Sequence, residues 1–419
     1  MATAAVRGFK DILPGEVSYW RKIEETARDT FRVSGFQEIR IPILEKTEIF
    51  ARGIGEHTDI VEKEMYTFTD RSGDSLTLRP EATAGLLRAV IEHKLYGRQP
   101  LLKLFTMGPM FRHERPQKGR LRQFHQINAE AIGTVAPAAD AEVIWMAWRI
   151  LERLASGAMR IELNSIGCPL CRPFHREDLI LYLSRISAKL CTECRRRSKT
   201  NPLRVFDCKN DPCRELMQRA PLLQHYYCPE CGDHFAEVIR ILKRLDIPFV
   251  INPYLVRGLD YYVRTTFEIT SPDLGAQSTV AAGGRYDGLV KDLGGPDLAG
   301  VGMAIGVERL ILLMDRAEAD HAIDLFICAL GPTARKKAVP WIKNWRNNGV
   351  SAQMSYEDKS LKAQMKQADR TGARQVVIVG DNELEKGIVT VRDMVAHEQR
   401  DVSVDEVVEL VEDIVRSPY

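Results

Sequence analysis

Eight of the nine cysteines fall within one stretch of the chain, between Cys168 and Cys231. Six of them form three Cys-x-x-Cys pairs, a spacing that lets two thiolates reach one ion from a single turn. The stretch from Cys168 to Asp233 is also rich in arginine and differs in composition from the sequence around it. We interpret it as a domain inserted into another domain, because strand-like sequence precedes it and resumes after it.

The length and charge of the chain limit its class. A chain of 419 residues with 45% hydrophobic residues can bury more than one core, which suggests about two to four domains. The net charge is only +2, so a polyanionic partner would need local basic patches. The N-terminus lacks a signal-peptide core, and no window approaches the roughly 20 apolar residues that span a bilayer. We therefore expect a cytoplasmic protein without membrane contact, whose cysteines hold metal or stay reduced.

The sequence around the insert predicts an α+β fold. Apolar residues recur at helical spacing from Tyr19 to Phe31, and residues 36–45 then alternate like a strand that Pro42 interrupts. A second helix is expected from Ala139 to Leu154. This pattern is typical of an antiparallel sheet with functional residues on one face. The other strand-like runs are residues 65–70, 75–80, 101–108, 122–133, 249–270 and 278–290.

The C-terminal part has a different pattern. After the polar residues 316–322, strand-like segments at 323–330 and 374–380 alternate with helical segments at 334–349 and 360–372. Such alternation predicts a separate α/β domain. The predicted boundaries are residues 1–165 and 246–320 for the two parts of the split domain, 166–245 for the insert and 321–419 for the α/β domain.

Four segments resemble a known family. The sequence LVRGLDYY at Leu255–Tyr262 resembles a signature of histidyl-tRNA synthetases. Phe111–Glu130 resembles motif 2 of class II aminoacyl-tRNA synthetases, Thr77–Gly85 resembles another family segment, and Gly300–Leu310 resembles motif 3. The resemblance begins near Arg7 and continues into the C-terminal region. It implies the class II synthetase antiparallel sheet with flanking helices, interrupted by the Cys-rich insert, and a C-terminal α/β anticodon-binding domain.

The resemblance, to the bacterial type of the family, also implies an activity and partners. Histidine would be activated by ATP, with Mg²⁺, to histidyl-adenylate and then transferred to the 3′ end of histidine tRNA. The helix at 19–31 and the strand after it resemble motif 1, which implies a homodimer; an ordinary core helix and strand is the alternative. A catalytically silent regulatory paralogue of the ATP phosphoribosyltransferase type and a zinc-bearing RNA-binding module are the rival functions.

Arginines are the candidates for the phosphate chemistry. Attack of a carboxylate on the α-phosphate of ATP gathers negative charge, and guanidinium groups offer permanent charge and planar donors to phosphate oxygens. By resemblance, Arg112 contacts the α-phosphate, Glu114 helps place ATP and Arg309 braces the triphosphate. Arg257 would take the role that other class II enzymes give to a metal ion, so Arg257 and Arg112 are the predicted catalytic residues, and Arg120 completes the ATP site.

A histidine-selective pocket needs acceptors for the ammonium group and polar partners for both ring nitrogens. By resemblance, Glu81, Thr83 and Gln126 hold the ammonium end, whereas Glu130 and Tyr262 meet the imidazole. Ala82 stands where many bacterial relatives are expected to have glycine. The predicted histidine site also contains Ala82, Tyr261 and the turn at residues 281–288.

The loop at residues 115–123 is rich in cations, and Gly119 allows it to turn. Such a loop can follow the acceptor end of a tRNA while its side chains test bases. By resemblance, Gln117 and Arg122 read the extra 5′ guanosine of histidine tRNA. A solvated hairpin tip is the alternative interpretation.

The cysteine spacing leaves the pairing open. Nineteen residues separate Cys171 from Cys191, which fits a zinc ribbon, and the later four cysteines would close a second site or share the first. We expect candidate structural zinc; reduced buried thiols and redox disulfides are the alternatives. His175 and His234 are spare ligands. The candidate metal ligands are Cys168, Cys171, Cys191, Cys194, Cys208, Cys213, Cys228 and Cys231.

Overall fold

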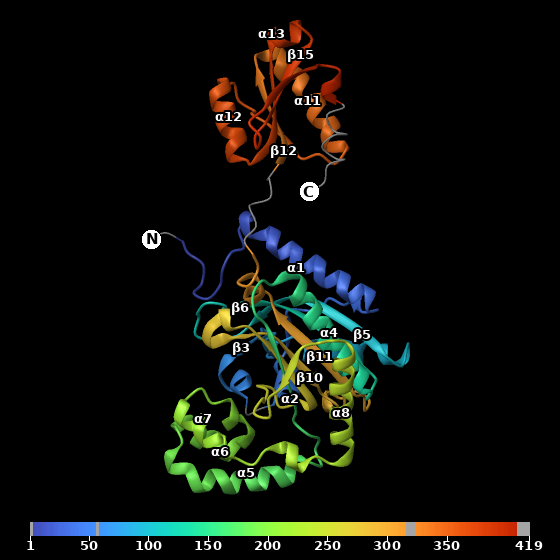
Figure 1. Ribbon diagram of the computed structural model, residues 1–419, viewed down its shortest axis with the longest axis vertical. Helices are drawn as coiled ribbons and strands as arrows, with labels where there is room; N and C mark the ends of the chain where they lie inside the picture. Colours follow the sequence, from blue (N-terminus) through green and yellow to red (C-terminus); the bar gives the residue numbers. More distant parts are fainter. Residues whose placement is uncertain (1–2, 56–57, 316–322, 409–419) are drawn as a thin grey trace. The chain divides into compact units, whose positions relative to one another are not determined.

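The structure is a computed structural model that describes residues 3–55, 58–315 and 323–408 (Figure 1). The chain divides into two compact units, Met1–Asp315 and Arg316–Tyr419. Each unit has its own sheet and its own hydrophobic core, and each is described by itself.

An eight-stranded sheet forms the centre of the first unit. Its inner strands pair antiparallel, whereas the outermost pairs, β1 with β5 and β7 with β8, are parallel. The predicted antiparallel sheet is therefore confirmed, with a parallel strand added at each edge. In spatial order the strands are β1 (Gln37–Glu38), β5 (Leu102–Phe111), β6 (Gln123–Ile132), β11 (Gly300–Gly306), β10 (Thr279–Arg285), β9 (Val263–Thr270), β7 (Arg160–Ser165) and β8 (Phe249–Ile251).

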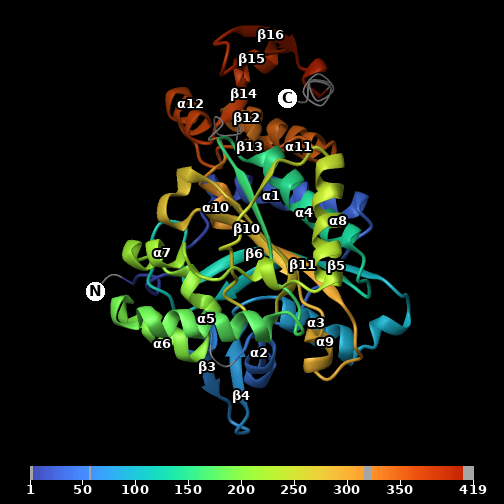
Figure 2. The ribbon, with the colours of Figure 1, turned by 60° about the horizontal axis from the view of Figure 1, so that its bottom comes forward.

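Three long helices contribute to the main core on one face of this sheet: α1 (Pro14–Val33), α4 (Pro137–Leu154) and α8 (Pro229–Arg244) (Figure 2). Each begins with proline in its first turn, where the fixed φ favours helix and the missing N–H is not needed. The helix expected from Ala139 thus begins two residues earlier. Among the helices of the described residues, none has the length and apolar character that crossing a membrane requires.

A separate three-stranded sheet corrects the expectation of one sheet. It contains β2 (Leu44–Lys46), β4 (Ser75–Leu78) and β3 (Tyr66–Thr69), all antiparallel. Proline has no N–H to donate to a ladder, and Pro42 lies between β1, which joins the large sheet, and β2, which joins the small one. In the sequence, α2 (Thr47–Ile54) lies between β2 and β3, and α3 (Thr83–Glu92) follows β4.

The Cys-rich insert is helical. It contains α5 (Arg172–Ile186), α6 (Thr192–Thr200) and α7 (Asp211–Met217), drawn in green in Figure 1. These helices share a small core with the 3₁₀ helix η4 (Pro202–Asp207). The remaining short elements of the first unit are η1 (Ile60–Glu64), η2 (Leu95–Gly97), η3 (Ser187–Lys189), η5 (Leu223–Tyr226), η6 (Pro272–Gln277), α9 (Leu289–Asp292) and α10 (Val307–Ile311).

The second unit confirms the predicted α/β domain. Its five-stranded sheet pairs β12 in parallel with β13 and β14, and then adds an antiparallel hairpin, β15 and β16, that the sequence pattern did not predict. In spatial order the strands are β13 (Ala352–Met354), β12 (Ile323–Leu330), β14 (Ala373–Gly380), β15 (Ile388–Asp393) and β16 (Gln399–Ser403); the helices are α11 (Pro332–Asn347), α12 (Leu361–Arg370), α13 (Asp381–Glu385) and η7 (Glu406–Val408).

Candidate active site

A cavity of about 300 Å³ lies on the face of the large sheet opposite the main core. Successive side chains of a strand point to opposite faces, and β6 uses this alternation fully. Its polar residues Gln126, Asn128 and Glu130 line the cavity, whereas Ile127 and Ala129 belong to the core beneath the helices. The sequence QINAE thus forms a polar wall of the cavity on one face of the sheet and contributes to the apolar core on the other face.

Glu130 is the most deeply buried acid of this wall, with only 1% of its surface exposed. Its carboxylate accepts hydrogen bonds from the Thr83 hydroxyl at 2.7 Å and from the Tyr286 hydroxyl at 2.6 Å. Burial raises the pKa of Glu130 to about 8, although both hydrogen bonds act in the other direction. The residue opposite it in the ladder is Gly302, where an added Cβ would lie 1.7 Å from a Glu130 oxygen. A glycine at this position is therefore a condition for the buried acid.

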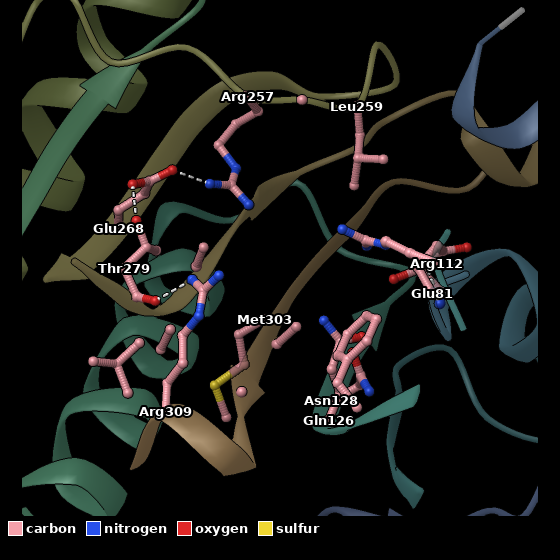
Figure 3. A pocket seen from close by; sticks show the side chains of 18 of the residues that line it. Glu81, Arg112, Gln126, Asn128, Arg257, Leu259, Glu268, Thr279, Met303 and Arg309 are labelled. Atoms are coloured by element: carbon pink, nitrogen blue, oxygen red, sulfur yellow. Dashed lines mark hydrogen bonds and ion pairs between the residues drawn. The ribbon is translucent and has the colours of Figure 1, made fainter. Parts of the chain in front are cut away.

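A second buried acid, Glu81, stands at the start of α3. Its two oxygens accept the backbone N–H groups of Thr83 at 2.7 Å and Ala84 at 2.8 Å, where the positive end of the helix dipole favours an anion. Burial nevertheless raises the pKa of Glu81, and the nearby charge of Arg112 opposes that rise. Figure 3 places Arg112 beside Glu81, and its Nε donates to the Pro80 carbonyl at 2.9 Å. The cation and the acid form one corner of the cavity.

A chain of polar contacts holds two arginines on the other side (Figure 3). Arg257 is ion-paired with Glu268, whose other oxygen accepts the Thr279 hydroxyl at 2.8 Å. The carbonyl of Thr279 accepts Nη1 of Arg309 at 2.6 Å. The buried Nε of Arg257 has no hydrogen-bond partner among the described residues. This side of the cavity therefore carries an unused buried donor on a partly buried cation, which suits an anionic ligand.

The loop between β5 and β6 closes the cavity near Arg309. Gln117 and Arg120 exchange backbone hydrogen bonds at 3.0 and 2.9 Å, and Gly119 between them has a positive φ of 70°. The predicted turn at Gly119 is thus confirmed. The carbonyl of Gly119 accepts Nε of Arg309 at 3.0 Å, while Arg120 is ion-paired with Glu114. The tip of the loop is tied to motif 3 through these contacts.

Most of the predicted pocket residues come together at this cavity, although they are far apart in sequence. Ala82 does not line it, because its methyl group packs in the apolar core that includes α3. Gln117 and Arg122 flank the three loop residues, 119–121, that do line it. The predicted residues that line the cavity are Glu81, Thr83, Arg112, Glu114, Arg120, Gln126, Glu130, Arg257, Tyr261, Tyr262 and Arg309.

Sequence reasoning missed several residues that line the same cavity. Asn128 follows from the alternation of β6, which was a signal available in the sequence. Glu268 and Thr279 lie on the neighbouring strands β9 and β10. Only the three-dimensional contacts reveal that Glu268 pairs with Arg257 and that the Thr279 carbonyl accepts a hydrogen bond from Arg309. Met303 lines the cavity from motif 3, where no chemical feature of the sequence marks it.

The eight insert cysteines form two groups of four. In each group all sulfur atoms lie within 4.8 Å of one another, which is the reach of a tetrahedral metal site. The first and third Cys-x-x-Cys pairs combine, and the middle pair joins the looser one. His175 and His234 belong to neither group, since their Nε2 atoms contact the Pro221 carbonyl at 2.8 Å and Asp140 at 3.3 Å. Group I is Cys168, Cys171, Cys228 and Cys231, and group II is Cys191, Cys194, Cys208 and Cys213.

Comparison with known proteins gives a consistent picture. A family model described as histidyl-tRNA synthetase matches residues 8–177 and 183–310, and one described as an anticodon binding domain matches residues 324–414. A histidine–tRNA ligase from Desulfatibacillum aliphaticivorans is 52% identical over 402 residues, which is 96% of each chain.

Two solved structures extend this comparison. The apo histidyl-tRNA synthetase of S. aureus has a TM-score of 0.82 and 35% identity, and covers 98% of this chain and 100% of its own. A protein from Bacillus halodurans C, described as an ATP phosphoribosyltransferase regulatory subunit/histidyl-tRNA synthetase, has a TM-score of 0.65 at 19% identity, with 91% and 99% coverage. The second likeness concerns the fold alone.

Replacing Glu130 by glutamine should change how stability depends on pH. The folded protein keeps the Glu130 proton up to about pH 8, whereas the unfolded chain releases it near the ordinary value of 4.5. As the pH rises between these two values, the unfolding free energy of the wild type should therefore fall relative to that of Glu130→Gln. The fall is at most about 1.4 kcal/mol per pH unit. Urea unfolding of both proteins at pH 5.5, 6.5 and 7.5 measures this. Glu92→Gln, at an exposed position of α3, is the control, and equal slopes for all three proteins would contradict the buried protonated acid.

Proposed function

Because this chain belongs to the histidyl-tRNA synthetase family, we propose that it activates histidine with ATP to histidyl-adenylate and transfers the histidine to the 3′ end of its tRNA. The observation that carries the proposal is the composition of one cavity. It joins a polar, acid-containing wall on β6 to the partly buried cations Arg112, Arg257 and Arg309. An amino acid fits the first feature, and a nucleoside triphosphate fits the second.

In this proposal the arginines serve the phosphate side. The histidine carboxylate attacks the α-phosphate, pyrophosphate leaves, and negative charge grows at phosphorus during the step. Preorganised cations in a closed site stabilise such charge better than water does. Arg257 and Arg112 act at the α-phosphate, while Arg309 and Arg120 hold the rest of the triphosphate and Glu114 orients ATP. ATP enters with Mg²⁺, whose charge offsets that of the phosphates.

The polar wall on β6 and the start of α3 would together bind histidine. Glu81, Thr83 and Gln126 accept hydrogen bonds from the ammonium group. Tyr261 and Tyr262 cover the pocket, and the centroids of their rings are 4.6 Å apart. A pKa of about 8 leaves Glu130 protonated at neutral pH, so its carboxyl group can donate as well as accept towards a ring nitrogen. A pocket that satisfies both ring nitrogens rejects amino acids that lack them.

The regulatory paralogue remains a distinct alternative with the same fold. A protein that only binds histidine has no need of three partly buried arginines around the same cavity. The intact arginine set of the cavity therefore favours catalysis over regulation. The RNA-binding module is likewise disfavoured, since it leaves this cavity without a purpose.

Arg257→Ala should lower the kcat of histidine-dependent ATP–pyrophosphate exchange by about 10²- to 10³-fold, the usual loss when one transition-state donor is removed. Histidine affinity, measured by equilibrium dialysis, should change little because the polar wall on β6 is intact. Arg52→Ala, at an exposed position of α2, is the matched control. Normal exchange by Arg257→Ala would refute the assigned role. An absence of exchange in the wild type with any amino acid would favour the regulatory paralogue.

The loop between β5 and β6 is proposed to meet the tRNA acceptor end through Gln117 at its turn and Arg122 next to β6. Arg122 is partly engaged, since its Nε donates to the Glu114 carbonyl at 3.2 Å, whereas the Gln117 side chain is exposed. Gln117→Ala should lower histidine transfer to tRNA about tenfold, consistent with a base contact worth about 1 to 3 kcal/mol, and leave pyrophosphate exchange unchanged. Gln99→Ala in another exposed loop is the control. Equal losses in both assays would overturn this assignment.

Groups I and II are each proposed to hold one structural zinc ion. Four thiolates on short turns match the donor set that zinc prefers, and the small helical insert has few other means of stabilisation.

The chain is also proposed to form a homodimer. The apolar residues Val33, Ile43 and Leu44, near the ends of α1 and β2, are 67%, 43% and 38% exposed.

Native mass spectrometry tests both proposals at once. We expect a dimer that carries two zinc ions per chain. Cys194→Ser should reduce the count to one per chain, because a three-thiolate site binds zinc more weakly. Cys328→Ser, in the core of β12, should leave the count at two. A monomer would exclude the dimer, and a metal-free wild type purified without chelators would exclude the zinc sites.

A further inference from the structure

The segment Leu255–Tyr262 carries both Arg257 and Tyr262, yet it lies in neither a helix nor a strand. It connects β8 to β9 through a succession of turns and bends. Its backbone N–H groups make few contacts outside the segment, such as that of Asp260 to the Ile54 carbonyl at 3.1 Å. The position of these two side chains therefore depends on groups that reach the segment from elsewhere.

Arg204 of η4 reaches the beginning of this segment. Its Nη1 donates to the Arg257 carbonyl at 3.2 Å. Gly258 leaves room for this approach, since an added Cβ there would lie 2.9 Å from the same nitrogen. Arg204 is only 14% exposed and is paired with Asp59 at 3.5 Å and Asp207 at 3.4 Å. It links the insert, the segment and the residues next to η1.

Arg172 of α5 reaches the end of the segment. Its Nη2 donates to the Tyr262 carbonyl, and its Nε donates to the Ile166 carbonyl at 3.0 Å. Arg172 directly follows Cys171 of group I, whereas Arg204 lies four residues before Cys208 of group II. Each of the two arginines therefore lies close in sequence to one of the cysteine groups.

Further contacts connect the insert to the same region. Arg197 is paired with Asp59 at 3.1 Å and Arg196 with Glu62 at 3.2 Å. The Asn201 amide donates to the Asp260 carboxylate at 2.8 Å. Two cations of the charge run of α6, Arg196 and Arg197, thus connect the insert to the split domain.

We infer that Arg204 and Arg172 of the insert are positioning residues for histidine activation, the first step of the proposed reaction. Arg204 holds the backbone of Arg257 and so supports adenylate formation, whereas Arg172 holds the backbone of Tyr262 and so supports histidine binding. This inference rests on the proposed function. Its physical basis is that a displacement of about 1 Å in a catalytic group can cost roughly 100-fold in rate.

We expect the two arginine variants to change different kinetic constants, one kcat and the other KM. A general loss of structure would not produce this difference. In histidine-dependent ATP–pyrophosphate exchange, Arg204→Met should lower kcat by roughly 100-fold with the KM for histidine nearly unchanged. Arg172→Met should raise that KM by about 10-fold, as the loss of about 1.4 kcal/mol of binding does, with kcat nearly unchanged. Equilibrium dialysis with histidine alone should show the same loss of affinity for Arg172→Met. Arg204→Lys keeps the charge towards Asp59 and should restore part of the rate.

Arg195→Met and Arg176→Met are matched controls, since both arginines are exposed on α6 and α5 of the same insert. Metal content and the thermal unfolding temperature are compared for all variants. If Arg204→Met does not fold, a partial loss of kcat in Arg204→Lys supports the inference, and wild-type kcat in that variant overturns it. Kinetics equal to the controls, or parallel changes of kcat and KM in both variants, also overturn it. A wild type without exchange would overturn the proposed function itself, and this inference with it.

Discussion

The antiparallel pairing of β6 with β11 is the constraint on which the site depends. Its register places Gly302 opposite Glu130, and the absent side chain is the space that the buried carboxyl group occupies. A slip of one residue would send Glu130 into the apolar core and bring Ile127 or Ala129 into the cavity. Such a slip would leave the acid without the hydroxyl groups of Thr83 and Tyr286. The hydrophobic face of the sheet and the polar face of the cavity therefore enforce each other.

The cavity concentrates charge that the whole chain does not have. With a net charge of +2 the protein has no large field to attract ATP, so attraction must come from the arginines at close range. Burying these cations requires partners, which Glu268, Glu114 and the backbone carbonyls supply. Because Glu268 leaves the Nε of Arg257 unused, the site keeps a donor for its ligand. Fixed donors of this kind do not have to reorganise during the reaction, which is why such sites accelerate it.

The insert has a part in this arrangement that its composition does not suggest. Its two cysteine groups lie among short helices that have only a small core of their own. Two of its arginines, Arg172 and Arg204, donate to carbonyl groups of a segment that has no regular structure. A loop that carries catalytic residues is generally more precise when a rigid element supports it. The ion pairs of Arg196 and Arg197 give these two members of the basic run of α6 a structural role apart from RNA binding.

The sequence by itself determined the α+β class, the α/β C-terminal domain and most of the pocket residues. Their signals are local: alternation in β6, proline before helices, Gly119 at a turn, and family motifs that are read residue by residue. Tertiary structure alone decided which strands share a sheet, since Pro42 marks a break but not the destinations of β1 and β2. It also decided the division of the cysteines into two groups and the contacts of Arg172 and Arg204 with the segment that bears Arg257 and Tyr262. These are contacts between residues tens of positions apart, and they depend on how the elements pack and not on any pattern within one element.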